Sequence, residues 1–421
     1  MKRSLLVVFL WMLLSEINAQ SVQNLYTEMA LYGKRQRMAK DIRENVIAKT
    51  FLQDINEDNE HRFESACNAI SQFLIKNDTV KLGFRKLFNA FDQLQYDTRK
   101  ALLEAAYAVY PTEFTEQIQQ IFRKQTDAKL FSMAAAYWIR ANPSIDVSNQ
   151  ISIRTVEQFS EPDSFPILES LTHYVQDKIK PKKTSAPSVK DLIQFHKEKG
   201  NKVIYSFQRE NRDYPGMAIV QNADGSFERR ADGAIMMFEQ LARSGSSLPY
   251  FISNGNTPQG MYSIQGTAVS RLGFIGPTPN IQLVMPLEDS SKNFFHGLKL
   301  SNEELISHYQ NYWPASWLKF KPRLEALEAG KIGRSEIIAH GTTIDPEFFK
   351  DYPFYPLTPT MGCLCAKELW NVTTGKPLVS EQFNMYSAFM STSGSKGYLI
   401  VINLNDKNGP VTRAELEALL K

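Results

Sequence analysis

The hydrophobic pattern divides the chain into three parts. A short apolar run at residues 5–14 is followed, over residues 20–177, by apolar positions repeated at helical spacing. One helical face consists of Phe63, Ala66, Cys67, Ile70, Phe73 and Leu74, with i, i+3, i+4, i+7 spacing. After residue 190 the pattern changes to the short alternating runs that are typical of β-strands. We therefore predict an α+β multidomain protein, with an all-α domain before a mainly β domain.

The first apolar run has the features of a secretory signal peptide. Lys2 and Arg3 precede residues 5–14, and small and polar residues follow as far as Ala19. The run is too short to cross about 30 Å of hydrocarbon, which takes ~20 apolar residues. We expect cleavage after Ala19, so that residues 1–19 are removed from an exported protein with no stable membrane span. A retained membrane anchor is the alternative.

Residues 20–177 are predicted to form the helical domain. Residues 97–111 and 127–143 each begin with Asp, end with Pro and contain Ala and aromatic residues between, and residues 163–175 are a looser third copy. This period is typical of helical-hairpin repeats such as HEAT or TPR, although unrelated packed helices share the same composition. Cys67 is expected to be a buried hydrophobic side chain. The domain shows no catalytic constellation.

Residues 178–190 are predicted to be a linker, because lysine, proline and serine replace the apolar period there. A basic strip that contacts an anionic polymer or lipid headgroups is the alternative.

Residues 191–421 are predicted to form the second domain. Strands are expected at 203–207 and 217–220, as an antiparallel pair, and at 249–253, with a short helix at 234–242.

The composition excludes several classes of function. The chain has 421 residues, 43% of them hydrophobic, and a formal net charge of +3. It is long enough for two or three domains, and its balanced charge gives no broad footprint for nucleic acid. Phosphate-binding loops, Rossmann glycines and HExxH are absent. We therefore expect no nucleic-acid partner and no cofactor.

Two short segments indicate cysteine chemistry. One predicted strand ends at His340 before Gly341, and a turn at Gly362 presents Cys363. Nucleophilic cysteine catalysis needs a thiolate, a nearby base and N–H groups for the oxyanion, and these segments could supply all three. We expect two antiparallel strands, joined by a loop over residues 345–359, to bring them together, and the histidine to lower the pKa of the thiol.

These segments resemble the L,D-transpeptidases of the YkuD family, which cross-link or modify bacterial peptidoglycan through an active-site cysteine. Residues 257–264, Thr-Pro-Gln-Gly-Met-Tyr-Ser-Ile, are similar to that family's Thr-Pro-x-Gly-x-Phe/Tyr-x-Ile segment and precede the His-Gly-Thr and Gly-Cys segments in the family's order. The resemblance covers roughly residues 200–405. It implies a mainly β L,D-transpeptidase domain with inserted helices, in the periplasm or cell envelope of a bacterium.

The resemblance also implies roles for individual residues. Cys363 would be the nucleophile and His340 the general base, with the Gly341 carbonyl orienting the imidazole. The backbone amides of Gly362 and Cys363 would form part of the oxyanion hole. Thr360 matches the family's Ser/Thr three positions before the cysteine.

The sequence departs from the family pattern at two positions beside the nucleophile. Met361 stands where the family has histidine, and Cys365 where it has arginine or asparagine; the separation of His340 from Cys363 is also longer. We predict substrate contacts from Thr360, Met361, Cys365 and Tyr262, and from His296, which is also an alternative base.

We therefore predict an L,D-transpeptidase that acts on peptidoglycan stem peptides through a Cys363 thioester. One alternative is an L,D-carboxypeptidase, in which water resolves the thioester. Another is a catalytically weak wall-binding protein whose helical domain docks an envelope protein. No metal is expected, because zinc sites space their cysteines differently from Cys363 and Cys365. A regulatory disulfide of Cys365 stays open.

Overall fold

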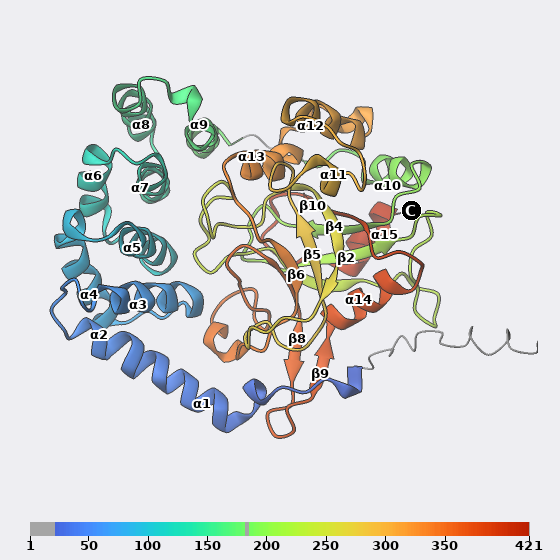
Figure 1. The fold of residues 1–421 in the computed structure, drawn as a ribbon, viewed down its shortest axis with the longest axis horizontal. Coiled ribbons are helices and arrows are strands. Elements are labelled where there is room, and N and C mark those ends of the chain that lie inside the picture. The colour runs from blue at the N-terminus through green and yellow to red at the C-terminus, as the bar shows by residue number, and fades with distance from the viewer. Residues whose placement is uncertain (1–21, 182–184, 421) are drawn as a thin grey trace, which may run out of the picture.

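The computed structural model describes residues 22–181 and 185–420 and shows an array of helices beside a β-barrel (Figure 1). The predicted signal peptide, residues 1–19, lies outside the described residues, as does the cleavage position. No helix in the described part of the chain has both the length and the apolar character to span a membrane. The predicted α+β class is confirmed at this level.

The helical array consists of two layers (Figure 1). The layer that faces the barrel contains α3 (Glu60–Phe73), α5 (Tyr96–Val109), α7 (Ala128–Ala141) and α9 (Pro166–Ile179). The outer layer contains α4 (Asp78–Asn89), α6 (Thr115–Lys124) and α8 (Ile145–Gln158). The similar segments seen in the sequence lie on α5, α7 and α9, which contact one another in that order. They therefore occupy successive places in one layer.

Local sequence explains where these helices begin. The side chains of Asn77, Asp127 and Ser144 accept hydrogen bonds from the first free backbone amides of α4, α7 and α8. Cys67 is fully buried on α3, as expected.

An N-terminal arm joins the array to the barrel side of the molecule (Figure 1). It contains η1 (Val22–Asn24), η2 (Glu28–Ala30), α1 (Tyr32–Asp41), η3 (Ile42–Ala48) and α2 (Lys49–Phe51). Leu25 and Ala30 pack against Trp370 and Phe383 of the C-terminal region. Arg35 forms an ion pair with Asp345, 3.1 Å apart, in the segment that connects the two predicted catalytic residues.

Eight strands close into a barrel in the order β1-β10-β4-β5-β6-β7-β3-β2. Their bounds are β1 Val203–Gln208, β2 Gly216–Gln221, β3 Phe238–Leu241, β4 Gly260–Ala268, β5 Asn280–Val284, β6 Ile338–His340, β7 Leu364–Ala366 and β10 Gly397–Asn403. The β1–β10 and β6–β7 pairs are parallel and the other pairs are antiparallel. The predicted antiparallel pairing of residues 203–207 with 217–220 is confirmed by β1 and β2.

Two local predictions in this region are wrong. The helix expected at 234–242 is not formed: residues 238–241 are β3, because pairing with β2 on one side and β7 on the other outweighs their helical propensity, and Ile235 forms an isolated bridge with Arg229. The strand expected at 249–253 is a run of turns, closed by a hydrogen bond from the amide of Ile252 to the carbonyl of Pro249 (3.0 Å).

Helices cover the outside of the barrel, and a small hairpin projects from it (Figure 1). The helices are α10 (Val189–Glu198), α11 (Ser291–Phe294), α12 (Asn302–Tyr309), α13 (Glu325–Lys331), α14 (Glu381–Met390) and α15 (Arg413–Leu420). The hairpin is β8 (Glu368–Trp370) with β9 (Pro377–Ser380). The connection between α9 and α10 is shorter than the predicted linker, residues 178–190, because the first residues of that range belong to α9 and the last to α10.

The largest hydrophobic core includes both the array and the barrel loops. Leu248, Phe251 and Ile252 from one loop, and Phe349 and Phe354 from another, belong to the same buried cluster as the helices. The first loop pairs with the turn that carries the predicted catalytic cysteine, and the second precedes that turn in the sequence. The helical array therefore contributes to the packing that supports the site.

Candidate active site

The predicted catalytic residues lie on neighbouring strands, but the predicted direction of the strands is wrong. β6 and β7 are parallel, with Ala339 opposite Leu364 and His340 opposite Cys365. Parallel neighbours need a crossover connection, and residues 341–363 provide it. We call residues 340–343 the His340 turn and residues 360–363 the Cys363 turn. Because the strands are parallel, the His340 turn and the Cys363 turn lie at opposite ends of this pair.

The thiol of Cys363 is held between two backbone groups. The amide of Ile338 donates to Sγ across 3.4 Å, and the thiol donates to the carbonyl of Glu336 across 3.6 Å. Although the residue is partly exposed, burial of the thiol raises its pKa to about 11. The lowered pKa expected from a neighbouring histidine is therefore wrong for this structure. Near neutral pH Cys363 is a thiol and needs a base to become a nucleophile.

The His340 side chain is buried and oriented by its own turn. Its Nδ1–H donates to the carbonyl of Gly341 across 2.5 Å, which is the contact predicted for that glycine. Nε2 is then the basic nitrogen, and burial lowers the pKa of the imidazole, so that the neutral form predominates near pH 7. No hydrogen bond joins His340 to Cys363 within the described residues. Proton transfer therefore requires the two side chains to come closer.

A buried carboxylate, which the sequence analysis missed, supports the His340 turn. Glu368 accepts from the amide of Thr342 (2.8 Å) and from the hydroxyl of Ser380 (2.5 Å), and burial raises its pKa to about 7. A Cβ atom at Gly341 would lie 2.2 Å from the carboxyl carbon of Glu368. The glycine after the histidine is therefore needed for this close approach. Nothing in the local pattern of residues 366–370 distinguishes Glu368 from a surface glutamate.

Hydroxyl groups hold the Cys363 turn. Thr360 Oγ1 donates to the carbonyl of Cys363 (2.8 Å) and accepts from the amide of Gly362 (3.1 Å). Gly362 has φ +113°, which favours glycine. Thr257 Oγ1 donates to the carbonyl of Gly362 (2.9 Å). Two of the three segments that carry the family resemblance, far apart in the sequence, therefore meet at this turn.

This geometry changes the predicted oxyanion hole. The amide of Gly362 is occupied by Thr360, so the prediction that it is a free oxyanion donor is wrong for this arrangement. The amide of Cys363 has no hydrogen-bond partner in the part of the chain that the structure describes. It remains available to a developing oxyanion. Thr360 itself, predicted to contact substrate, is used to shape the turn.

Two other residues predicted to contact substrate are buried. Tyr262 is completely buried and donates its hydroxyl to the carbonyl of Pro258 (2.7 Å). Cys365 is also completely buried, its Sγ lies 3.5 Å from Thr358 Oγ1, and burial raises the pKa of its thiol to about 12. Both side chains support the fold around the site and cannot contact a substrate in this arrangement.

The remaining two predicted contacts differ in position. His296 packs against the ring of Tyr398 and its Nε2 lies 3.0 Å from the carbonyl of Gly397, so it lies beside the β4–β10 pair and not beside the β6–β7 pair. Met361 is 56% exposed beside Cys363. It stays a predicted substrate contact.

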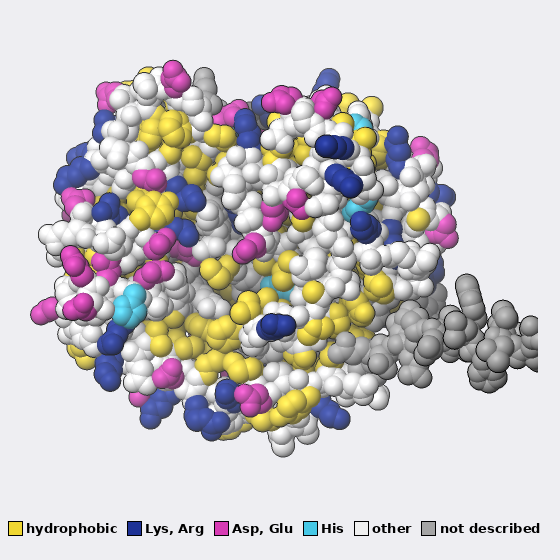
Figure 2. Space-filling model, viewed as in Figure 1, with side chains coloured by type: hydrophobic (Ala, Val, Ile, Leu, Met, Phe, Trp, Pro, Cys, Tyr) yellow, Lys and Arg dark blue, Asp and Glu magenta, His cyan; other side chains and the backbone are white. Residues whose placement is uncertain are grey.

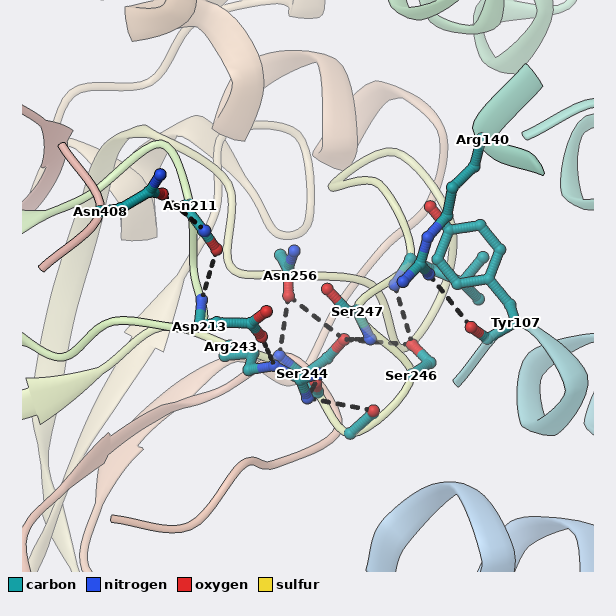
Figure 3. A network of polar contacts seen from close by, with 12 residues as sticks. Tyr107, Arg140, Asn211, Asp213, Arg243, Ser244, Ser246, Ser247, Asn256 and Asn408 are labelled. Atoms are coloured by element: carbon teal, nitrogen blue, oxygen red, sulfur yellow. Dashed lines mark hydrogen bonds and ion pairs between the residues drawn. The ribbon is translucent and has the colours of Figure 1, made fainter. Parts of the chain in front are cut away.

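Residues 243–257 contribute apolar side chains to the core shared with the helical array and also carry a network of polar contacts (Figure 3), and we call them the polar wall. The amide of Gly245 donates to the carbonyl of Thr360 (2.7 Å), so this wall pairs directly with the turn. Within the wall, the amide of Ser244 donates to Asn256 Oδ1 (2.9 Å) and Arg243 forms an ion pair with Asp213 (2.5 Å). The Cys363 turn is therefore fixed on the side that faces the helices.

All three cysteines are free thiols, and the described residues contain no group of three or more His, Cys, Asp or Glu side chains that could hold a metal ion. Basic and acidic side chains are interspersed on the face in Figure 2. Neither the known family models, nor the curated proteins, nor the solved structures include a match to this chain.

Proposed function

We propose that the protein is an exported cysteine acyltransferase, an L,D-transpeptidase, that acts on peptidoglycan stem peptides in a bacterial cell envelope. The observation that carries the proposal is that a hydrogen bond and a strand pairing join the three sequence segments of the resemblance in the barrel. Thr257 binds the carbonyl of Gly362, and β6 places His340 beside the strand that follows Cys363. The closed barrel is not the sandwich that is typical of L,D-transpeptidases, so the proposal depends on the site and not on the fold.

The reaction has two steps. His340 Nε2 accepts the proton of the Cys363 thiol, whose sulfur attacks the carbonyl between an L-centre and a terminal D-residue of a stem peptide. The C–N bond breaks, the D-residue leaves with a proton from His340, and a thioester remains on Cys363. An acceptor amine then attacks the thioester, loses its proton to His340 and restores the thiol.

One observation favours a second candidate, a catalytically weak wall-binding protein that uses the helical array to dock an envelope partner. The thiol has a raised pKa and donates to the carbonyl of Glu336, a contact that stabilises its unreactive form. An active enzyme must break this contact when substrate binds. A binding protein has no such requirement.

Turnover of a defined stem tetrapeptide tests the proposal. The chain without residues 1–19 is incubated with the tetrapeptide, with and without an acceptor amine, and the products are separated by mass. A transpeptidase releases the terminal D-residue and forms an amine-linked product. Release without that product identifies a carboxypeptidase. No release by the wild type, or equal release by Cys363→Ala, overturns the acyltransferase proposal.

A further inference from the structure

A buried arginine lies next to the Cys363 turn and was not singled out from the sequence. Arg334 follows α13, whose end fixes it through a hydrogen bond from its amide to the carbonyl of Ala329 (2.9 Å). The same short segment continues into β6 and supplies the two backbone groups that hold the Cys363 thiol. The arginine and the thiol are therefore positioned by one piece of chain.

The guanidinium of Arg334 binds backbone carbonyls instead of a carboxylate. Nη1 donates to the carbonyls of Tyr250 and Asn256 (the latter 3.0 Å away), and Nη2 donates to that of Gly255 (3.0 Å). No ion pair of Arg334 is present among the described residues. Its positive charge is therefore not neutralised by a carboxylate at contact distance, and its orientation is fixed by the polar wall, residues 243–257.

The guanidinium also packs directly against the residue before the nucleophile. A Cβ atom at Gly362 would lie 2.5 Å from Arg334 Nη2 and 2.8 Å from the carbonyl of Gly255. Only glycine permits this approach, so the positive φ of Gly362 and the position of Arg334 are two parts of one arrangement. The charge of Arg334 opposes the effect of burial on Cys363, because it lowers the pKa of the thiol.

We propose that Arg334 is the positioning residue of the nucleophile: it fixes the Cys363 turn against the polar wall and supplies the positive charge that stabilises the Cys363 thiolate. The proposal rests on the proposed function, in which Cys363 is the nucleophile. Arg334 does not contact the substrate in this account, because its side chain is buried and three of its five N–H groups bind carbonyls. It acts through Gly362, against which it packs, and through the effect of its charge on the Cys363 thiol.

The test is the rate at which iodoacetamide alkylates Cys363 at pH 9 in the chain without residues 1–19, followed by peptide mass mapping. Below its pKa the thiolate fraction changes tenfold for each pKa unit, so we expect Arg334→Gln to slow alkylation about tenfold. Arg334→Lys keeps the charge and is expected to stay within about threefold of the wild type. Thermal unfolding of each variant shows whether it is folded at the temperature of the assay.

Arg323→Gln is the matched control. Arg323 is also buried and donates to backbone carbonyls, those of Trp317 (2.9 Å) and Leu318 (2.7 Å), but neither carbonyl belongs to the Cys363 turn or to the polar wall. We expect wild-type alkylation from this variant. Wild-type alkylation of Arg334→Gln, equal slowing in Arg323→Gln, or tenfold slowing in a folded Arg334→Lys would each overturn the charge role. If Arg334→Gln does not fold, the lysine variant decides alone.

Alkylation needs no stem peptide, so the two proposals fail separately. Stem-peptide turnover that depends on Cys363, together with no effect of Arg334→Gln on alkylation, rejects only the role of Arg334. A tenfold effect on alkylation without any turnover supports the positioning of a reactive thiol and rejects the acyltransferase.

Discussion

The His340 turn and the Cys363 turn lie at opposite ends of the β6–β7 pair and are built differently. The His340 turn is buried: the His340 side chain, Thr342 and Thr343 are almost inaccessible, and Glu368 binds the backbone from within. The Cys363 turn reaches the surface at Met361 and is held by threonine hydroxyls and by Arg334. The base is therefore fixed in place, while the nucleophile is the part that a substrate can reach and move.

This difference assigns the two turns different sensitivities. A substitution in the His340 turn disturbs packing and buried hydrogen bonds, so its effect on the free energy of unfolding is expected to be large. A substitution in the Cys363 turn changes the reactivity of the thiol more than the stability of the fold. The following variants test this contrast, beginning with the largest expected effect.

Replacing the proposed base tests whether His340 activates the Cys363 thiol. Because general base catalysis contributes roughly 10²- to 10⁴-fold, we expect His340→Asn to slow acylation of Cys363 by a factor in that range. The measurement is the rate of acylation by a stem tetrapeptide, followed by intact mass. His296→Asn is the control, because His296 lies beside the β4–β10 pair, away from β6 and β7. This variant should be acylated at the wild-type rate. Wild-type acylation of His340→Asn would show that another group accepts the proton.

The glycine of the His340 turn should be the most sensitive position for stability. Gly341→Ala places a methyl group 2.2 Å from the carboxyl carbon of Glu368, and such overpacking costs about 3 kcal/mol in the free energy of unfolding. Urea denaturation measures this loss in the free energy of unfolding. Gly409→Ala is the control, because a Cβ atom there meets no atom within 4 Å. Equal stability of the two variants would show that the His340 turn is not tightly packed.

The buried carboxyl of Glu368 should make stability depend on pH. Its pKa is about 7 when folded and 4.5 in the unfolded chain, so the folded state holds the proton more tightly and its stability falls as pH rises from 4.5 through 7. We expect Glu368→Gln to reduce this fall by about 2 kcal/mol, measured by urea denaturation at pH 5 and pH 8.

Glutamine can keep both contacts of Glu368, with its oxygen on the amide of Thr342 and its amide on the hydroxyl of Ser380. Glu104 and Glu325 also have a raised pKa, about 7 and about 8, and contribute the same trend to both proteins. The difference between the two curves therefore isolates Glu368. An equal change in the free energy of unfolding between pH 5 and pH 8 in wild type and variant would show that Glu368 does not have a raised pKa.

The smallest effect is expected at the Cys363 turn. Thr257→Val removes the hydrogen bond to the carbonyl of Gly362 and should cost about 1 kcal/mol in the free energy of unfolding. The same variant, while still folded, should also be alkylated or acylated at Cys363 more slowly than the wild type, because the Cys363 turn loses one of the hydrogen bonds that orient it. Thr267→Val, in β4 and with no side-chain hydrogen bond among the described residues, is the control. Identical behaviour of the two variants would contradict the role of Thr257.

The sequence predicted some parts of this arrangement because their physical signals are local. Helical spacing identified the array, and the His-Gly and Gly-Cys pairs identified both turns. The sequence could not show that β6 and β7 are parallel, since strand direction depends on the path of the intervening chain. It also could not identify Glu368 or Arg334, whose roles arise from burial and from contacts with distant segments. Tyr262 and Cys365 were assigned to the substrate because a motif gives the neighbourhood of a residue but not its exposure.

Covalent labelling of Cys363 tests the central claim most directly. The wild type and Cys365→Ser are incubated with a carbapenem, an acylating β-lactam, beside Cys363→Ala, and each is analysed by intact mass and peptide mapping. The account predicts one acyl group on Cys363 in the first two proteins and none in Cys363→Ala. An adduct on Cys365, an adduct that survives in Cys363→Ala, or no adduct on the wild type would contradict it.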